Sequence, residues 1–386
     1  MNKIAIVAVA YNRIDSLARL LDSLEKAIYN VPATLIISID KSNTDVVEKY
    51  ADNYSWPHGR LIVDKHEKNL GLRAHMLSLG KWFEEFDALV VLEDDIAVSP
   101  LFYSYTCQTV NKYSNSDQIA GISLYGFEVN YQTAVPFQPL KKGYDTYFMN
   151  CAMSWGQVWM KRSWLKFYEW YQDHTEFNRT PTLPDRICSW KPSSWLKYHT
   201  RYCIENNLYF VFPYFSLSTN CSDAGTHNSS QLTAFQVALQ QGPRFDYRLP
   251  EFGVEDAVYY DGFFENKALY ETLGVDETNC CLDLYGTRYN RVRKQYWLTT
   301  MRADFTVVKS YGIAYRPIEA NILNGVKGTD IYLYDTQLQP WQKPGVSKES
   351  YLYRHYIDSM FLFLKKYGFM NLLKDFISKG KSYIIR

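Results

Sequence analysis

The chain has 386 residues, 47% of them hydrophobic, so it is long enough to bury one large core or two smaller ones. Lys and Arg number 42 against 41 Asp and Glu, and the resulting net charge of +1 gives no overall field that would attract nucleic acid. No apolar stretch reaches the roughly 18 residues that a membrane span requires, and the N-terminal sequence MNKIAIVAVAYNR lacks the cleavage site of a signal peptide. These features predict a globular, cytoplasmic protein that at most contacts the inner face of a membrane.

The first hundred residues alternate apolar strands with amphipathic helices. Residues 4–10 are continuously apolar, as expected for a parallel strand that is covered on both faces. Further strands are predicted at 34–39, 60–64 and 88–92, and helices at 14–29, 43–54 and 71–86. This alternation predicts the α/β class, with a doubly wound, mostly parallel sheet.

Polar side chains follow three of these strands. Tyr11 and Arg13 come after the first, Asp40 after the second, and Glu93, Asp94 and Asp95 at the end of the fourth. In open α/β sheets, ligands bind outside the carboxyl ends of the strands, so these residues are expected to converge on one ligand site.

The remainder of the chain is predicted to be less regular. Helices are expected at 101–113, 154–172 and 193–207, followed by a strand at 209–214 and a polar loop at 218–230. After about residue 240, short runs rich in Tyr, Val and Ile, such as 330–336, predict a separate strand-rich module. The expected division is therefore a ligand-binding domain over 1–235, a module of unassigned role over 236–345, and a helical tail over 346–386.

The tail is predicted to form two amphipathic helices separated by Gly368. Its apolar faces carry Ile357, Met360, Phe361 and Leu364, then Phe369, Leu372, Leu373 and Phe376. Lys and Arg are in excess over Asp and Glu in this segment, so it suits the surface of an anionic leaflet. Docking on the protein's own surface explains the same pattern, and the sequence leaves both interpretations open.

The three consecutive carboxylates of residues 93–95 repel one another unless a cation lies among them. Carboxylates on a short turn suit a hard divalent cation such as Mn²⁺ or Mg²⁺, which shares its coordination shell with substrate phosphates. Such an ion neutralises charge that develops on a diphosphate leaving group.

The segment VVLEDDIAVSP (90–100) resembles the DXD-type motif of GT-A glycosyltransferases. Its EDD form is similar to that of the N-acetylglucosaminyltransferase I family and of bacterial family-2-like enzymes of capsule and lipopolysaccharide synthesis. VAVAYNR (7–13), ISIDKS (37–42) and NLGLRAH (69–75) resemble the nucleotide-binding motifs of that family. MSWGQVW (153–159) is similar to its acceptor segment, and TNCSDAGTH (219–227) to its later loop that carries a His. The blocks follow the family's order over roughly residues 1–230, which makes them specific as a set.

This resemblance implies a role for each matching residue, and a GT-A domain over 1–235. Asp95 would ligate the metal, with His227 as a further ligand, while Glu93 and Asp94 would lie toward the ribose. Asp40 would recognise the base, and Tyr11 and Arg13 would contact the nucleoside or the diphosphate. Arg73 or His75 would neutralise the phosphate charge. Trp155 and Gly156 would bind the acceptor.

The reaction that the resemblance implies is inverting transfer of a hexosyl or N-acetylhexosaminyl group. The donor would be a nucleotide-diphosphate sugar, with UDP expected as the nucleotide, and the acceptor a glycan or lipid-linked sugar of surface polysaccharide biosynthesis. A general base must take a proton from the acceptor hydroxyl. The family carries this base as an Asp before a Trp, where this chain has Ser193 and Ser194. A Ser cannot replace a carboxylate unaided, so Asp223 is the first candidate base and Asp185 the alternative.

Two other functions fit parts of the pattern. A non-catalytic nucleotide-sugar-binding protein is compatible with the Ser pair at the expected base position. A sugar nucleotidyltransferase on a similar sheet is less compatible, because that class has a Gly-rich phosphate loop after its first strand and AVAYNRIDS has no Gly.

Overall fold

The computed structural model describes residues 2–223, 235–242, 246–288 and 293–340, together with residues 357, 359–362, 364–366, 368–371, 373–374 and 377. These residues belong to two compact units. The first contains the chain up to Asp223, apart from Thr133–Pro136, and continues after the gap to Lys267. The second contains the described chain from Ala268 onward together with Thr133–Pro136.

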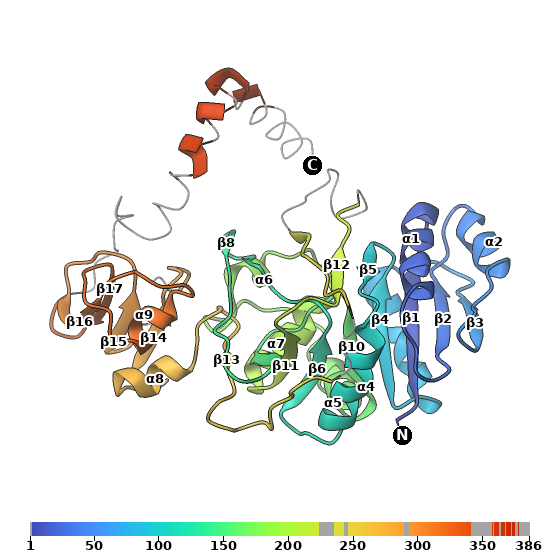
Figure 1. The fold of residues 1–386 in the computed structure, drawn as a ribbon, viewed down its shortest axis with the longest axis horizontal. Helices are drawn as coiled ribbons and strands as arrows, with labels where there is room; N and C mark the ends of the chain where they lie inside the picture. The colour runs from blue at the N-terminus through green and yellow to red at the C-terminus, as the bar shows by residue number, and fades with distance from the viewer. Residues whose placement is uncertain are drawn as a thin grey trace. The chain divides into compact units, whose positions relative to one another are not determined.

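A nine-stranded sheet forms the centre of the first unit (Figure 1), in the order β13-β9-β11-β6-β10-β4-β1-β2-β3. Strands β3, β2, β1 and β4 are parallel to one another, and β10 joins β4 to β6 as an antiparallel strand. The bounds are β1 (Ile4–Ala10), β2 (Thr34–Ile39), β3 (Leu61–Lys65), β4 (Ala88–Glu93), β6 (Ile119–Ser123), β9 (Thr146–Met149), β10 (Gln157–Met160), β11 (Tyr209–Pro213) and β13 (Tyr259–Tyr260). The predicted α/β class with a mostly parallel central sheet is confirmed.

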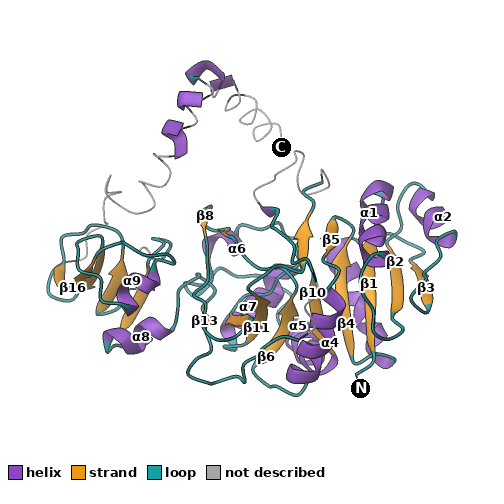
Figure 2. Cartoon of the chain, in the orientation of Figure 1, coloured by secondary structure: helices purple, strands orange, loops and turns teal. Residues whose placement is uncertain are grey.

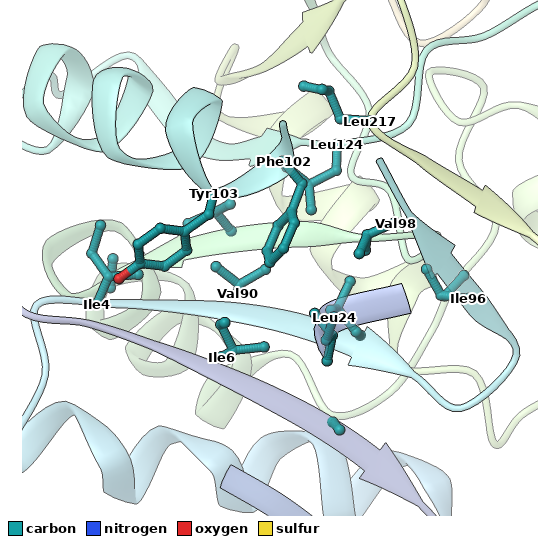
Figure 3. Close-up of a cluster of buried hydrophobic side chains, with 14 of the residues drawn as sticks. Ile4, Ile6, Leu24, Val90, Ile96, Val98, Phe102, Tyr103, Leu124 and Leu217 are labelled. Carbon is teal, nitrogen blue, oxygen red and sulfur yellow. The ribbon is translucent and has the colours of Figure 1, made fainter. Parts of the chain in front are cut away.

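Helices cover both faces of this sheet (Figure 2). On one face, α1 (Ile14–Glu25), α2 (Val46–Asp52) and α4 (Phe102–Tyr113) pack on alternate strand residues such as Ile6 and Val90, in the core shown in Figure 3. On the other face, α5 (Lys161–Asp173) contacts β6, β10 and the 3-10 helix η1 (Leu79–Glu84), which follows α3 (Leu72–Ser78). The helix α7 (Leu196–Glu205) packs against α5. Burial on both faces explains why the strands are apolar throughout.

Two sequence-based expectations differ from this structure. The helix predicted over 154–172 begins only at Lys161, because residues 157–160 form β10. A strand of four residues is too short for its hydrophobic pattern to be distinguished from that of a helical turn. The first unit also extends beyond the expected boundary at 235 to Lys267, because β13 pairs with β9 at the edge of the main sheet.

Short elements complete the first unit beside the main sheet. The strands β5 (Ile96–Val98) and β12 (Ser218–Asn220) pair with each other, and α6 (Asp185–Cys188) precedes α7. The short strand β7 (Val129–Asn130) also belongs to the first unit, while β8 (Val135–Pro136) is assigned to the second.

The second unit has its own four-stranded sheet, so the prediction of a strand-rich C-terminal module is confirmed. The order is β14-β15-β17-β16, with β14 (Cys280–Asp283), β15 (Tyr296–Thr299), β16 (Thr306–Tyr311) and β17 (Ile331–Asp335), and the helices are α8 (Ala268–Leu273) and α9 (Glu319–Leu323). Its core is built on Trp297, Phe305, Tyr334 and their neighbours.

The described part of the tail is helical on both sides of Gly368. Gly368 has a φ of +76° and donates its N–H to the carbonyl of Leu364, which ends the first helix in the conformation that glycine adopts most easily. Within the described residues, no helix is both long enough and apolar enough to cross a membrane.

Candidate functional site

The acidic triplet lies at the carboxyl end of β4, beside the end of β1. Glu93 is the last residue of β4, where it pairs with Val9, and Asp94 and Asp95 form a two-residue turn that leads into β5. Strand β12 runs antiparallel to β5, and the N–H of Cys221 donates to the carbonyl of Asp95 at 2.7 Å. The first residue after β12 is thus held at the triplet.

The guanidinium of Arg13 forms a two-point ion pair with Asp94. Nη2 contacts Oδ1, and Nε donates to Oδ2 at 3.2 Å. Nη2 also lies 3.4 Å from Oδ2 of Asp95. The side chains of Arg13, Asp94 and Asp95 are 26%, 6% and 20% exposed, so this cluster is partly shielded from solvent screening.

One arginine does not neutralise three carboxylates. Burial, together with the charges of Asp95 and Asp94, raises the pKa of Glu93 to about 8. Burial raises the pKa of Asp94 to about 6, although Arg13 acts in the opposite direction. The cluster therefore retains a deficit of positive charge that a cation would offset.

A divalent metal fits this donor set only in part. Among the residues that the structure describes, no three Asp, Glu, His or Cys side chains are grouped so that they could hold an ion. Hard divalent ions, however, are commonly held by one or two carboxylates with substrate phosphates completing the shell. Asp94 and Asp95 supply such carboxylates, while His227 lies outside the described residues.

Asp223 lies in the same region, held by helix α1. Its Oδ2 accepts a hydrogen bond from Ser16 Oγ at 2.7 Å and pairs with the guanidinium of Arg19. Burial alone would raise the pKa of Asp223, but the hydrogen bonds and positive charge of Arg19 outweigh it, and the pKa falls below its ordinary value. A carboxylate paired in this way is a weak proton acceptor.

Ser16, Arg19 and Cys221 were not predicted from the sequence as members of this site. Arg13, Ser16 and Arg19 are spaced three residues apart around the first turns of α1, so neighbouring members of the set lie close together on the helix. That spacing was the signal in the sequence that could have indicated them.

Asp40 is buried and organises the loop that precedes α3. Its Oδ1 accepts hydrogen bonds from the backbone N–H groups of Lys41 at 2.9 Å and Leu70 at 2.8 Å, and Oδ2 accepts from Gly71 at 2.9 Å. This role was not expected, and base recognition by Asp40 stays a prediction.

The two residues expected at the phosphates have other partners. Arg73 contacts α7 and the preceding loop, where it donates to the carbonyl of Pro192 and to Tyr198 Oη at 3.1 Å. His75 is 2% exposed, with Nε2 2.9 Å from Ser38 Oγ. Burial and the neighbouring His66 lower the pKa of His75 to about 4, so the ring is neutral at pH 7 and does not supply the expected positive charge.

The expected acceptor residues lie beside β12. Gly156 has a φ of +92°, and a Cβ there would meet Ser218 Oγ at 2.6 Å, which explains the need for glycine. Trp155 is half-buried against Tyr125 and Phe235, and its carbonyl accepts a hydrogen bond from Ser218 Oγ at 2.5 Å. Tyr11 follows β1 and is half-buried.

The start of α7 carries no carboxylate. Trp195 occupies the N-cap position without a side-chain capping bond, Ser194 is half-buried, and Ser193 is exposed. Asp185 begins α6, where its exposed side chain lies 3.6 Å from Arg179.

No protein-family model and no curated protein sequence matches the chain. Among similar solved structures is S. aureus TarS 1–349 in complex with UDP-GlcNAc, with a TM-score of 0.40 and 14% identity over 59% of this chain and 61% of that chain. Another is the mannosyltransferase PcManGT from Pyrobaculum calidifontis in complex with GDP-Man and Mn²⁺, with a TM-score of 0.39 and 8% identity over 58% and 59%. GalNAc-T7 with UDP, GalNAc and Mn²⁺ has a TM-score of 0.39 and 15% identity over 55% and 42%. The chain thus matches less than two thirds of each, and similarities this low establish neither a family nor a reaction.

Proposed function

We propose that the chain is a GT-A glycosyltransferase, which moves a sugar from a nucleotide-diphosphate donor to a glycan or lipid-linked acceptor with the help of Mn²⁺ or Mg²⁺. The observation that carries the proposal is the cluster of Asp94, Asp95 and Arg13 at the carboxyl ends of β4 and β1. Ligands of open α/β sheets bind at this edge, and carboxylates with an arginine are suited to a metal and a diphosphate.

Each residue of the cluster has a role in this proposal. Asp95, assisted by Asp94, would hold the metal, which when bound would supply positive charge to offset that developing on the departing diphosphate. Arg13 contacts the diphosphate, and Tyr11 and Asp40 lie toward the nucleoside. Trp155 and Gly156 border the acceptor, with β12 holding them beside the triplet.

The finer assignments extend the resemblance of the sequence motifs. We infer a UDP-sugar donor, inverting transfer and a place in the synthesis of a bacterial surface polysaccharide, such as capsule or lipopolysaccharide. Asp223 is the candidate base closest to the triplet, but its pairing with Arg19 and Ser16 requires that the acceptor or nucleotide displace these partners before it takes a proton. Asp185 remains the alternative.

Release of nucleoside diphosphate from a panel of UDP- and GDP-sugars, with and without Mn²⁺, tests the proposal. We expect Mn²⁺-dependent release that falls by about 10²-fold or more in Asp95→Asn, because the metal's charge stabilisation is lost. Asp87→Asn is the matched control, since Asp87 precedes the opposite end of the same strand and its side chain accepts from the backbone of Lys3. Release that does not depend on Mn²⁺ or on Asp95 would contradict the proposal.

A second candidate function is nucleotide-sugar binding without transfer. It is favoured by Ser193 and Ser194 at the start of α7 and by the commitment of Asp223 to an ion pair. Metal-dependent donor binding with neither transfer nor hydrolysis would favour this candidate over the first.

We further propose that the tail contacts an anionic membrane surface. In its described residues, Phe361 and Phe369 are each 66% exposed and Met370 is 63% exposed, and Lys365 and Lys374 lie in the same segment. An amphipathic helix with apolar and basic side chains binds at the interface of anionic lipids. This contact would bring the protein to lipid-linked acceptors.

A further inference from the structure

Arg13 holds the position that a cation would take between two carboxylates. Two nitrogens of its guanidinium contact both oxygens of Asp94, and Nη2 lies 3.4 Å from Oδ2 of Asp95. These are oxygen atoms that a divalent ion would need as ligands. Arg19, which lies within α1, is paired with Asp223, and no contact of the described residues directs it at the triplet.

Arg13 is also in a place from which its side chain can change partners. It directly precedes α1, in the short connection that follows β1, and no side-chain bond caps the helix there. The backbone is anchored by the strand and by the bond from the N–H of Leu17 to the carbonyl of Arg13. A guanidinium on a long side chain suits a diphosphate as well as a carboxylate.

We propose that Arg13 is an internal counter-charge, which pairs with Asp94 and Asp95 when no nucleotide is bound and transfers to the diphosphate when nucleotide and metal bind together. The inference rests on the proposed function, because it requires a site for a metal and a diphosphate at the triplet. Its consequence is cooperative binding. When the metal binds alone, it must separate Arg13 from its carboxylates, and the guanidinium gains no new partner. When the diphosphate binds with the metal, it provides that partner.

Titration of Mn²⁺ alone, followed by the electron paramagnetic resonance signal of free Mn²⁺, tests this coupling. We expect Arg13→Gln to bind Mn²⁺ about tenfold more tightly than the wild type, since a competing cation is removed, and typical coupling factors lie at about 5- to 150-fold. UDP or GDP should strengthen Mn²⁺ binding to the wild type and have a much smaller effect on Arg13→Gln. Arg60→Gln is the control, because Arg60 pairs with Glu85 at an exposed site and its loss should change neither value.

The results separate this inference from the proposed function. If nucleotide strengthens Mn²⁺ binding to the wild type but Arg13→Gln binds Mn²⁺ alone no better, the counter-charge role is wrong and the nucleotide site stands. If no nucleotide affects Mn²⁺ binding to the wild type, both are wrong.

A second readout applies because Arg13→Gln leaves Asp94 buried without its partner and could unfold. The temperature of unfolding in EDTA and in Mn²⁺ should show that Mn²⁺ stabilises Arg13→Gln more than the wild type. Arg13→Lys, which keeps the charge but has no fork of two donors, should have intermediate Mn²⁺ affinity. The inference would be overturned if Arg13→Gln is unfolded, Mn²⁺ does not restore its fold, and Arg13→Lys binds Mn²⁺ with the affinity of the wild type.

Discussion

Gly156 links the expected acceptor segment to β12 through a close approach that no other residue permits. Gly156→Ala adds a Cβ at 2.6 Å from Ser218 Oγ in a backbone with φ of +92°. We expect a loss of about 2–4 kcal/mol in the free energy of unfolding, from backbone strain and overpacking together. Urea unfolding measures this loss.

Gly242→Ala is the matched control for this substitution. Gly242 has a φ of +90°, but no atom of the described residues lies within 4 Å of the added Cβ, so only the strain of about 1 kcal/mol should appear. Equal losses in the two variants would show that the contact with Ser218 contributes nothing.

At the scale of single residues, the sequence predicted where a side chain lies in the fold better than which side chains it contacts. The placement of Asp94, Asp95 and Arg13 follows from the rule that carboxyl ends of parallel strands share one edge, and the structure brings these three residues together. The burial of His75 could not be predicted in this way, because the side of α3 that faces Ser38 depends on how the helix packs. The ion pair of Asp223 with Arg19 joins residues 204 positions apart, which no local pattern encodes.

Pairing of β12 with β5 brings Cys221 and Asp223 close to the triplet. Cys221→Pro removes the N–H that donates to the carbonyl of Asp95. We expect the affinity for nucleotide with Mn²⁺ to fall roughly tenfold, the effect of losing about one backbone hydrogen bond. Cys221→Ala keeps the N–H, and calorimetry should find its affinity within a few-fold of the wild type. Equal losses in both variants would assign the effect to the thiol instead of the strand pairing.

The packing of α7 against α5 buries a histidine among aromatic rings. His199 stacks on Phe167 with ring centroids 4.2 Å apart, and burial lowers its pKa to about 3. The unfolded chain takes up the proton below about pH 6.5 while the folded chain does not. Stability should therefore fall as pH falls from about 6.5 toward 3, by up to about 1.4 kcal/mol per pH unit for this group.

His199→Phe tests this dependence, since neither ring nitrogen of His199 has a hydrogen-bond partner among the residues that the structure describes. Denaturant unfolding at several pH values should show a flatter loss of stability on acidification for the variant. The buried His75, with a pKa of about 4, contributes in the same direction and remains in the variant. An unchanged slope would mean that His199 is protonated in the folded chain.

Helices and strands were predicted well where the hydrophobic pattern extends over many residues and poorly where it covers only a few. The alternation over the first hundred residues predicted β1 to β4 and the helices between them to within a few residues. Strand β10 was missed, because a four-residue strand within a Trp-rich segment also fits a helix, and only pairing with β4 and β6 decides between them.

At the scale of the molecule, the chain divides into two units with separate cores and a helical tail. Deletion of residues 346–386 should abolish sedimentation with vesicles that contain phosphatidylglycerol, because the basic and apolar side chains of the tail provide the affinity. Nucleotide binding, which depends on the first unit, should be retained. Equal sedimentation of the full and shortened chains would place membrane contact elsewhere or exclude it.

The most direct test of the central claim is calorimetric titration with UDP and with GDP, in the presence and absence of Mn²⁺. The wild type should bind at least one of the two nucleotides only with Mn²⁺, and Asp95→Asn should lose about tenfold or more of that affinity, while Asp87→Asn keeps it. If the folded wild type binds neither nucleotide with Mn²⁺, or if Asp95→Asn binds as tightly as the wild type, the triplet is not a metal-nucleotide site and the account is contradicted.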